Sequence, residues 1–275
     1  MPSQSEKANQ FRSLHQRAGA FVIPNPYDAG TARLLAHLGF EALATTSAGF
    51  AFSRGRPDGG VTREETMEHA RLIVDATDLP VSADLEGGFG DAPKETAETI
   101  KQAAQAGLVG GSIEDSTGRK DDPIYAHELA VERVRAAVEM ARSLPFPFTL
   151  TARSENFLWG RPDLADTIRR LQAFQEAGAD VLYAPGLKTR EEITTLVRAV
   201  DRPINVLAGI PGTPDVAALT AIGVKRISVG GALARAALGS FLAAAREIKE
   251  KGTFGFTETA APMREINAIF AGWGT

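Results

Sequence analysis

Three acidic residues near the ends of two apolar segments are the strongest candidates for chemistry in this sequence. Asp84 and Glu86 follow one apolar segment, and Glu114 ends the next. Carboxylates that are crowded together repel one another unless a cation or protons neutralise them. Oxygen ligands without cysteine or histidine favour a hard divalent ion. We therefore predict that Asp84, Glu86 and Glu114 form a Mg²⁺ site, or a Mn²⁺ site.

Arg153 ends a third apolar segment and is the candidate for substrate binding. A guanidinium binds a carboxylate through two parallel hydrogen bonds, so we expect Arg153 to hold a substrate carboxylate. Plainer interpretations exist. Asp84 and Glu86 also suit helix caps or solvated loop charges, and Arg153 suits an ion pair with Glu155 or Glu114. The functional interpretation is favoured because charged residues end three consecutive apolar segments.

Eight short apolar segments alternate with segments of helical periodicity. Each is four to six residues long, as expected for parallel strands that are buried on both faces. Eight strand–helix units predict a closed (β/α)₈ barrel, a TIM barrel. The alternative is a doubly wound open sheet, but no GxGxxG motif follows the first strand. The predicted strands are 20–24, 42–46, 81–84, 110–114, 148–153, 181–184, 204–207 and 226–229.

The loops that follow the strands of such a barrel meet at one mouth, where active sites lie. We therefore expect polar residues near the other strand ends to join the same site. Tyr27 follows the first strand, Thr46 and Ser47 come at the end of the second, and Asn205 lies in the seventh. Asn205 equally suits an ordinary turn. These residues are candidates for substrate binding, and Thr46 and Ser47 for catalysis as well.

Other polar features are weaker candidates. Gly230-Gly231 suits either phosphate binding at a helix N-terminus or a tight turn. The glycine-rich 87–90 segment lacks the lysine and spacing of a phosphate-binding loop, so we expect it to be mobile. The histidines fall in helical segments away from the strand ends, and we expect them to have structural roles. They are His15, His37, His69 and His127.

Composition narrows the class of protein. The chain has 275 residues, a net charge of −4 and no cysteine, which excludes disulfides and cysteine nucleophiles. No cluster of basic residues interleaved with aromatics is present, so we expect no nucleic-acid partner. No apolar run is long enough to cross a membrane, and we expect a cytoplasmic protein. We predict one barrel domain over 1–275, in which about 251–275 form a C-terminal helical extension.

Five ordered motifs on successive strands carry a resemblance that covers nearly the whole chain. They are TTSAGFA at 45–51, GRPDG at 55–59, SADLEGGFGD at 82–91, GSIEDS at 111–116 and TARSEN at 151–156. In these motifs the chain resembles the isocitrate lyase/phosphoenolpyruvate mutase superfamily. Members of that family make or break a bond to C3 of a pyruvate-like unit through a metal-stabilised enolate.

The resemblance implies roles for particular residues. The carboxylates that match Asp84, Glu86 and Glu114 bind Mg²⁺, partly through water. The arginine that matches Arg153 holds a substrate carboxylate. The segment that matches Thr46-Ser47-Ala48 supplies backbone donors to a 2-oxo or enolate oxygen, and Asp58 matches an acidic residue beside the metal. We therefore expect Asp58 and Arg153 to be catalytic as well, and Asp84 to contact the substrate.

The chain departs from the family in one loop. Isocitrate and methylisocitrate lyases carry a Lys-Lys-Cys-Gly-His loop after the fourth strand, but here 115–123 reads DSTGRKDDP. We therefore expect a carbon–carbon lyase or decarboxylase of a small 2-oxo or 2-hydroxy dicarboxylic acid. The alternatives are a phosphonate-forming mutase and a member that binds 2-oxo acids with little turnover. The 116–122 loop suits a mobile lid, with Arg119 or Lys120 reaching the substrate.

The resemblance also implies an oligomer. Family members form dimers and tetramers in which the last barrel helix is swapped between subunits. Apolar residues near 263–270 predict a helix in the C-terminal extension that must bury its face against something; they are Met263, Ile266, Ile269 and Phe270. We therefore expect a homodimer or a homotetramer.

Overall fold

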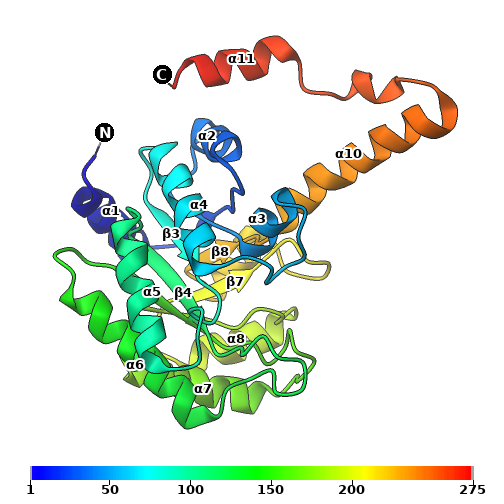
Figure 1. The fold of residues 1–275 in the computed structure, drawn as a ribbon. Helices are drawn as coiled ribbons and strands as arrows, with labels where there is room; N and C mark the ends of the chain where they lie inside the picture. The colour runs from blue at the N-terminus through cyan, green and yellow to red at the C-terminus, as the bar shows by residue number, and fades with distance from the viewer. Residues whose placement is uncertain (1, 274–275) are drawn as a thin grey trace.

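The computed structural model describes residues 2–273, and in them eight parallel strands form one barrel-shaped sheet (Figure 1). Each strand lies within a predicted range, and the order β1-β8-β7-β6-β5-β4-β3-β2, with a backbone hydrogen bond from Ala44 to Pro24, just after β1, to close it, confirms the barrel. The open-sheet alternative is wrong, because an open doubly wound sheet does not return to its first strand. The strands are β1 (Phe21–Ile23), β2 (Leu43–Ala44), β3 (Val81–Asp84), β4 (Gly110–Glu114), β5 (Thr149–Arg153), β6 (Val181–Tyr183), β7 (Ile204–Leu207) and β8 (Arg226–Ser228).

The barrel closes between β1 and β2 through few contacts. The Ala44 N–H donates to the Pro24 carbonyl at 3.1 Å. Asn25 reinforces this junction, because its Nδ2 donates to the Thr45 carbonyl at 3.0 Å. Its Oδ1 accepts the Gly230 N–H at 2.8 Å, from the loop after β8. One buried side chain therefore links the ends of three neighbouring strands.

The helices that cover the barrel form because apolar and small residues recur every three or four positions. In α5, for example, Thr96, Ile100 and Ala103 are fully buried against the sheet and α6. Side-chain caps set several starting points: Thr62 begins α4 and Thr189 begins α8, each with a capping box. The helices of the barrel are α2 (Ala29–His37), α3 (Ser47–Ser53), α4 (Arg63–Asp75), α5 (Pro93–Gln105), α6 (His127–Ser143), α7 (Leu164–Glu176), α8 (Arg190–Ala199) and α9 (Val216–Ala221).

An N-terminal helix, α1 (Gln4–Gln16), covers the end of the barrel opposite the strand carboxyl ends. Phe11 and Leu14 of this helix pack against Phe21 of β1. The His15 ring lies edge-on to both Phe11 and Phe21, with centroid separations of 4.8 and 5.0 Å. His15 is thus part of a buried plug, which agrees with the structural role expected for it.

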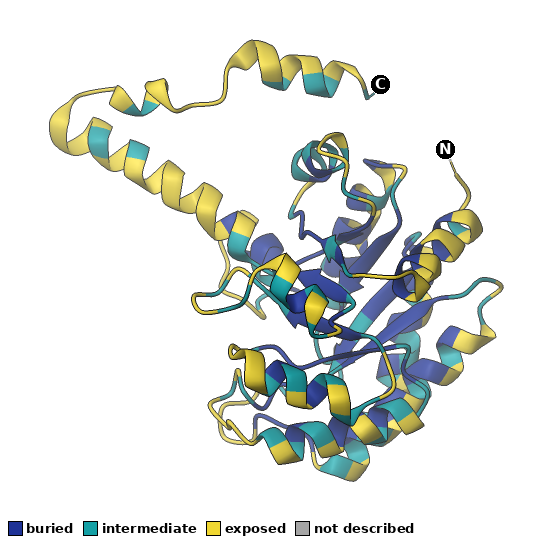
Figure 2. Ribbon diagram, turned by 180° about the vertical axis from the view of Figure 1, so that it is seen from behind, coloured by how far each residue is buried: buried dark blue, intermediate teal, exposed yellow. Residues whose placement is uncertain are grey.

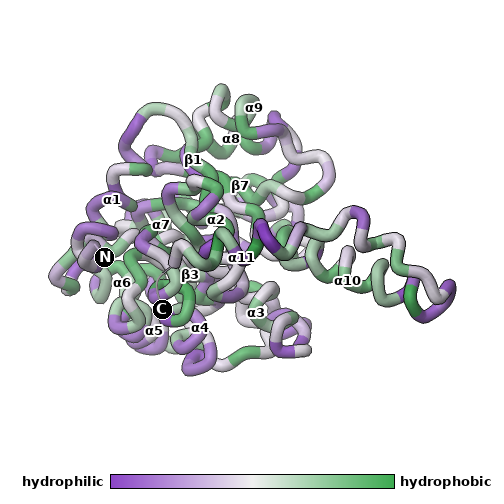
Figure 3. The backbone as a smooth tube through the Cα atoms, turned by 90° about the horizontal axis from the view of Figure 1, so that it is seen from above, coloured by the Kyte–Doolittle hydropathy of each residue, from purple (hydrophilic) through white to green (hydrophobic). Residues whose placement is uncertain are grey.

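The C-terminal segments leave the barrel. Helix α10 (Ala232–Lys251) projects outward, and a short 3₁₀ turn η1 (Gly255–Glu258) leads to α11 (Met263–Ala271), which lies beside α2 (Figure 1). The predicted C-terminal helix is therefore confirmed. Helix α10 is largely exposed (Figure 2) although it carries hydrophobic segments (Figure 3), and its Phe241 is 69% exposed. Among residues 2–273 no helix is both long and apolar enough to cross a lipid bilayer.

Candidate active site

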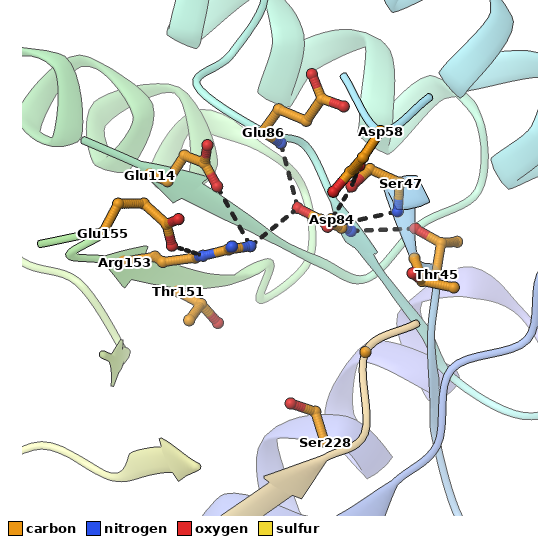
Figure 4. Close-up of polar contacts among 12 residues, drawn as sticks. Thr45, Ser47, Asp58, Asp84, Glu86, Glu114, Thr151, Arg153, Glu155 and Ser228 are labelled. Carbon is orange, nitrogen blue, oxygen red and sulfur yellow. Dashed lines mark hydrogen bonds and ion pairs between the residues drawn. The ribbon is translucent and has the colours of Figure 1, made fainter. Parts of the chain in front are cut away.

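The carboxylate of Asp84 is held in place at the end of β3. The Ser47 hydroxyl donates to Asp84 Oδ2 at 2.9 Å and lies 3.3 Å from Asp58 Oδ1. The Asp84 N–H donates to Thr45 Oγ1 at 3.1 Å. Thr46 begins α3 by accepting the Gly49 N–H, which aims the first turn of this short helix at the barrel mouth. The predicted residues Ser47, Asp58 and Asp84 are thus gathered into one cluster (Figure 4), which Thr46 adjoins as the residue that caps α3.

Arg153, at the end of β5, lies among carboxylates. Its Nη1 is 3.2 Å from Glu114 Oε2 and 3.5 Å from Asp84 Oδ1, and its Nε donates to Glu155 (Figure 4). The guanidinium carbon also lies 5.2 Å from the ring centroid of Tyr183. Both the substrate-binding and the ion-pair interpretation of Arg153 are compatible with these contacts, since the ion pairs hold the guanidinium at the mouth.

The site carries more negative than positive charge. Burial, followed by the nearby Asp84, raises the pKa of Glu86 to about 7. Burial also raises the pKa of Glu114 well above its usual range, and burial and Asp84 raise that of Asp58. Oε1 of Glu86 is buried and has no hydrogen-bond partner. Five carboxylates surround one arginine; they are Asp58, Asp84, Glu86, Glu114 and Glu155.

This excess of buried carboxylate oxygens is what a hard divalent cation would neutralise. Within residues 2–273, however, no three acidic or histidine side chains are arranged to hold one ion directly. Arg153 lies between Asp84 and Glu114, and the Glu86 carboxylate is turned away from it (Figure 4). The donor set therefore fits an ion that is held partly through water, and the metal site stays a prediction.

A cavity of about 180 Å³ opens beside this cluster and descends into the barrel. Of the predicted residues, seven line it: Thr46, Ser47, Ala48, Asp58, Asp84, Arg153 and Asn205. Glu86 and Glu114 line a neighbouring hollow with Asp91 and Ser116. Tyr27 lines a separate apolar hollow beside Phe52 and Phe241, so the structure does not bring it to this cavity.

Several residues that the sequence did not single out as site residues also line the cavity, among them Thr45, Tyr183 and Arg226. Tyr183 was recognisable as the last residue of a strand, and burial raises its pKa to about 12. Arg226 was recognisable as a charge at the start of an apolar strand. Asn205 is not a turn residue: it is buried in β7, and its Oδ1 accepts from Arg226 Nε at 2.9 Å.

Two further buried arginines hold the loops that carry the carboxylates. Arg133 donates to three backbone carbonyls of the 87–91 loop, so this loop is braced rather than free. Gly87 is required there, because a Cβ would lie 2.7 Å from the Ser116 carbonyl. Arg170 pairs with Asp115 at 3.3 Å, and the other oxygen of Asp115 accepts the Glu155 N–H.

Two other loops were assigned possible roles from the sequence, the 116–122 loop and the Gly230-Gly231 segment. Arg119 lies 2.9 Å from Asp91 and is half exposed, so it does not reach the cavity in this structure, and Lys120 is exposed. The N–H groups of Val229 and Gly230 both donate to Asn25 Oδ1. The Gly230 amide is therefore already used, whereas Gly230 and Gly231 both line the cavity, so the tight-turn and the phosphate-binding interpretations both stay predictions.

Comparisons with known proteins place this geometry in a family. A family model described as phosphoenolpyruvate phosphomutase matches residues 11–249. A crystal structure of a protein from Burkholderia cenocepacia J2315, assigned provisionally as a lyase or mutase, has a TM-score of 0.96 and 62% identity. The match covers 98% of this chain and 96% of that one.

Two relatives have named substrates or products. The oxaloacetate decarboxylase of Chromohalobacter salexigens is 30% identical over 245 residues, which cover 86% of this chain and 83% of the decarboxylase. The structure of an oxaloacetate acetylhydrolase in complex with its product oxalate is 26% identical, with a TM-score of 0.87. That match covers 98% of this chain and 95% of the acetylhydrolase.

Proposed function

Because this chain belongs to the phosphoenolpyruvate mutase/isocitrate lyase superfamily, we propose that it is a Mg²⁺-dependent carbon–carbon lyase or decarboxylase. Its substrate is a small 2-oxo or 2-hydroxy dicarboxylic acid. The superfamily consists of lyases and mutases that act on small carboxylic acids. The observation that carries the proposal is the position of Arg153 between Asp84 and Glu114 at the mouth of the cavity.

The proposed roles follow from the donor chemistry. Asp84, Glu86 and Glu114 hold Mg²⁺, or Mn²⁺, in part through water. A bound divalent ion supplies charge stabilisation to a developing oxyanion. Arg153 binds the substrate carboxylate with its planar fork.

The segment Thr46-Ser47-Ala48 lies at the start of α3, where backbone N–H groups lack helical partners. These groups donate to the 2-oxo oxygen. Ser47 also orients Asp84 through its hydroxyl, and Asp58 lies behind Ser47.

The absence of cysteine agrees best with a reaction that needs no dedicated thiol acid. When a 2-oxo diacid loses CO₂ from the carbon next to its carbonyl, the bonding electron pair moves toward the 2-oxo oxygen. Water then supplies the proton to carbon. The relatives support this substrate class, since one is an oxaloacetate decarboxylase and another was solved with oxalate.

A panel of acids tests the proposal. Oxaloacetate, malate, 2-methylmalate and 2,3-dimethylmalate are each incubated with protein and MgCl₂, and products are followed by proton NMR. We expect turnover of at least one acid that stops with EDTA and in Asp84→Ala. Phosphonopyruvate is included with ³¹P detection, and its conversion to phosphoenolpyruvate would assign the protein as a mutase instead. Oxalate binding without any turnover would leave a binding protein and contradict the lyase proposal.

We also propose that the protein is a homodimer or homotetramer that exchanges α10 between subunits. Helix α10 exposes Leu238, Phe241 and Leu242, and Ala234 is its only buried residue within the described chain. Burying such side chains against a second copy removes apolar surface from water. Light scattering is expected to give a dimer or tetramer, with Phe241→Glu shifted toward monomer and Phe241→Leu unchanged. A wild-type monomer at micromolar concentration excludes this assembly.

A further inference from the structure

Arg226 is a buried cation on the floor of the cavity that also contains Arg153. It begins β8, is 5% exposed, and lines the same cavity of about 180 Å³. Its Nε donates to Asn205 Oδ1 at 2.9 Å and its Nη2 to Thr151 Oγ1 at 2.9 Å. Both partners are neutral. Its Nη1 is buried and has no hydrogen-bond partner.

The charge of Arg226 is not balanced by the part of the chain that the structure describes. No carboxylate of residues 2–273 forms an ion pair with it, whereas Arg153 has three carboxylate partners. Burial lowers the pKa of Arg226 to about 10, and the guanidinium therefore stays charged at neutral pH. A buried charge without a counterion is strongly unfavourable. An anion that enters the cavity would supply the missing partner.

Arg153 and Arg226 lie at different depths in the wall of the cavity. Thr151 precedes Arg153 by two residues on β5, and alternate residues of a strand share a face. Thr151 therefore lies below Arg153 by about 6.6 Å, the rise of two residues. Because Arg226 contacts Thr151, its guanidinium lies one layer deeper in the barrel than that of Arg153. This separation is comparable to the length of a four-carbon diacid.

The wall of the cavity leaves room for such a molecule. The side chains that face it from β2, β3 and β4 are small: Ala44, Ser82 and Ser112. Asn205 fixes the orientation of Arg226, since its Nδ2 donates to Ser228 Oγ at 3.0 Å while its Oδ1 accepts from the guanidinium. Nη1 is thus the one guanidinium nitrogen of Arg226 that the described residues leave without an acceptor.

We propose that Arg226 binds the second carboxylate of the substrate, while the 2-oxo acid end binds at Arg153. This inference rests on the proposed function and narrows it: the substrate is a short diacid of about four carbons that spans both arginines. Arg226 acts as a specificity-determining residue. It selects diacids over monoacids such as pyruvate, because a monoacid leaves the buried guanidinium without a counterion.

The test compares short ligands that occupy only the Arg153 end of the cavity with a four-carbon diacid long enough to span both arginines. Binding of pyruvate, oxalate and the unreactive analogue 3,3-difluorooxaloacetate is measured by calorimetry with MgCl₂ in wild type, Arg226→Met and Arg226→Lys. We expect Arg226→Met to weaken the difluoro analogue by about tenfold or more, as for loss of a buried charge pair. Pyruvate and oxalate do not reach Arg226, so we expect each to bind to Arg226→Met as tightly as to wild type. Arg226→Lys keeps the charge and is expected to restore part of the preference.

Thermal unfolding separates this role from a structural one. Removing an unpaired buried charge is expected to leave Arg226→Met as stable as wild type or more stable. Equal weakening of all three ligands, or no change in any, would overturn the inference. A rise in Tm with sodium chloride that depends on Arg226, without selective weakening of the diacid, would assign the residue to an inorganic anion and overturn it too. Failure of wild type to bind oxalate or pyruvate would instead contradict the proposed function.

Discussion

The Ser47 hydroxyl donates a hydrogen bond of 2.9 Å to Asp84 Oδ2, and the Ser47 N–H lies 3.4 Å from the same oxygen. One residue at the start of α3 therefore fixes the direction of the carboxylate that ends β3. Residues that orient a metal-binding carboxylate tune its affinity for the ion.

The first prediction is that Ser47→Ala weakens the binding of Mg²⁺ that supports the reaction. We expect the Mg²⁺ concentration at half-maximal rate to rise about 10- to 100-fold, the range seen when such orienting partners are removed. Steady-state rates across a MgCl₂ titration provide the measurement. Ser53→Ala is the matched control, because Ser53 ends the same helix and donates only to the Phe50 carbonyl. An unchanged titration for Ser47→Ala would refute the role.

Arg153→Lys is expected to lower kcat/KM about 100-fold or more while the protein stays folded. Lysine keeps the positive charge near Asp84 and Glu114 but lacks the planar fork that binds a carboxylate at two points. Initial rates and thermal melting of the same preparation are compared. Arg169→Lys serves as the control, since Arg169 forms an exposed ion pair with Asp166 on α7. Activity close to wild type would leave Arg153 with a structural role alone.

The loop at 116–122 is expected to become less accessible when ligand binds. Ser116 and Ile124 form an isolated antiparallel bridge, and Ser116 Oγ accepts from Trp159 Nε1 at 3.0 Å, so the two ends of the loop are anchored. Arg119, within the exposed part, pairs with Asp91. Trypsin cleaves after Arg119 and Lys120, and MgCl₂ with oxalate is expected to slow these cuts severalfold. Mass spectrometry identifies the fragments, with cleavage after the exposed Lys188 as the internal control. Equal cleavage with and without ligand counts against a lid.

His15 is expected to make the protein less stable in mild acid. Burial, with a smaller contribution from Arg226, lowers the pKa of His15 to about 3. The unfolded chain binds a proton near pH 6.5, but the folded chain does not until about pH 3. The His15 contribution therefore reduces the free energy of unfolding as the pH falls through this window, by about 1.4 kcal/mol per pH unit, and has no effect above it.

Urea unfolding at pH 7, 6 and 5 checks this prediction. His15→Phe keeps an aromatic ring between Phe11 and Phe21 but cannot titrate, so the fall of stability with acid is expected to be shallower than in wild type. His37→Phe, at an exposed position of α2, is expected to follow the wild-type curve. If His15→Phe and wild type lose stability in parallel, the histidine is not the cause.

Much of the fold was predictable because strands buried on both faces are necessarily apolar and short. The range 81–84 matches β3 to the residue, and 110–114 matches β4. The cluster around Asp84 was predictable for a related reason, since polar residues directly after buried strands must converge at the mouth of a barrel. The direction in which α10 leaves the barrel was not, because helical periodicity indicates an apolar face but not where the helix points.

Side-chain direction limited what could be predicted within the site. Glu86 has a positive φ of 48°, and its carboxylate points away from that of Asp84 (Figure 4). No local sequence pattern predicts this conformation. Tyr27 follows a strand like its neighbours in the site, but it faces the root of α10 instead. Arg226 was not predictable as a site residue, because a charged side chain at the start of a strand ordinarily reaches solvent. Only the structure shows that the Arg226 side chain is buried.

The position of β1 between β2 and β8 has a consequence for how the protein folds. β1 completes its other edge by pairing with β8, Phe21 opposite Arg226, so both of its neighbours must be present before the ring is continuous. Contacts between residues so distant in the chain form slowly, because a long loop must be closed first. On a ribosome, β1 therefore waits until β8 has emerged. Closing of the ring is thus a late event in folding, and amide hydrogen exchange should find Phe21, whose N–H donates to the Lys225 carbonyl, among the first strand amides to open.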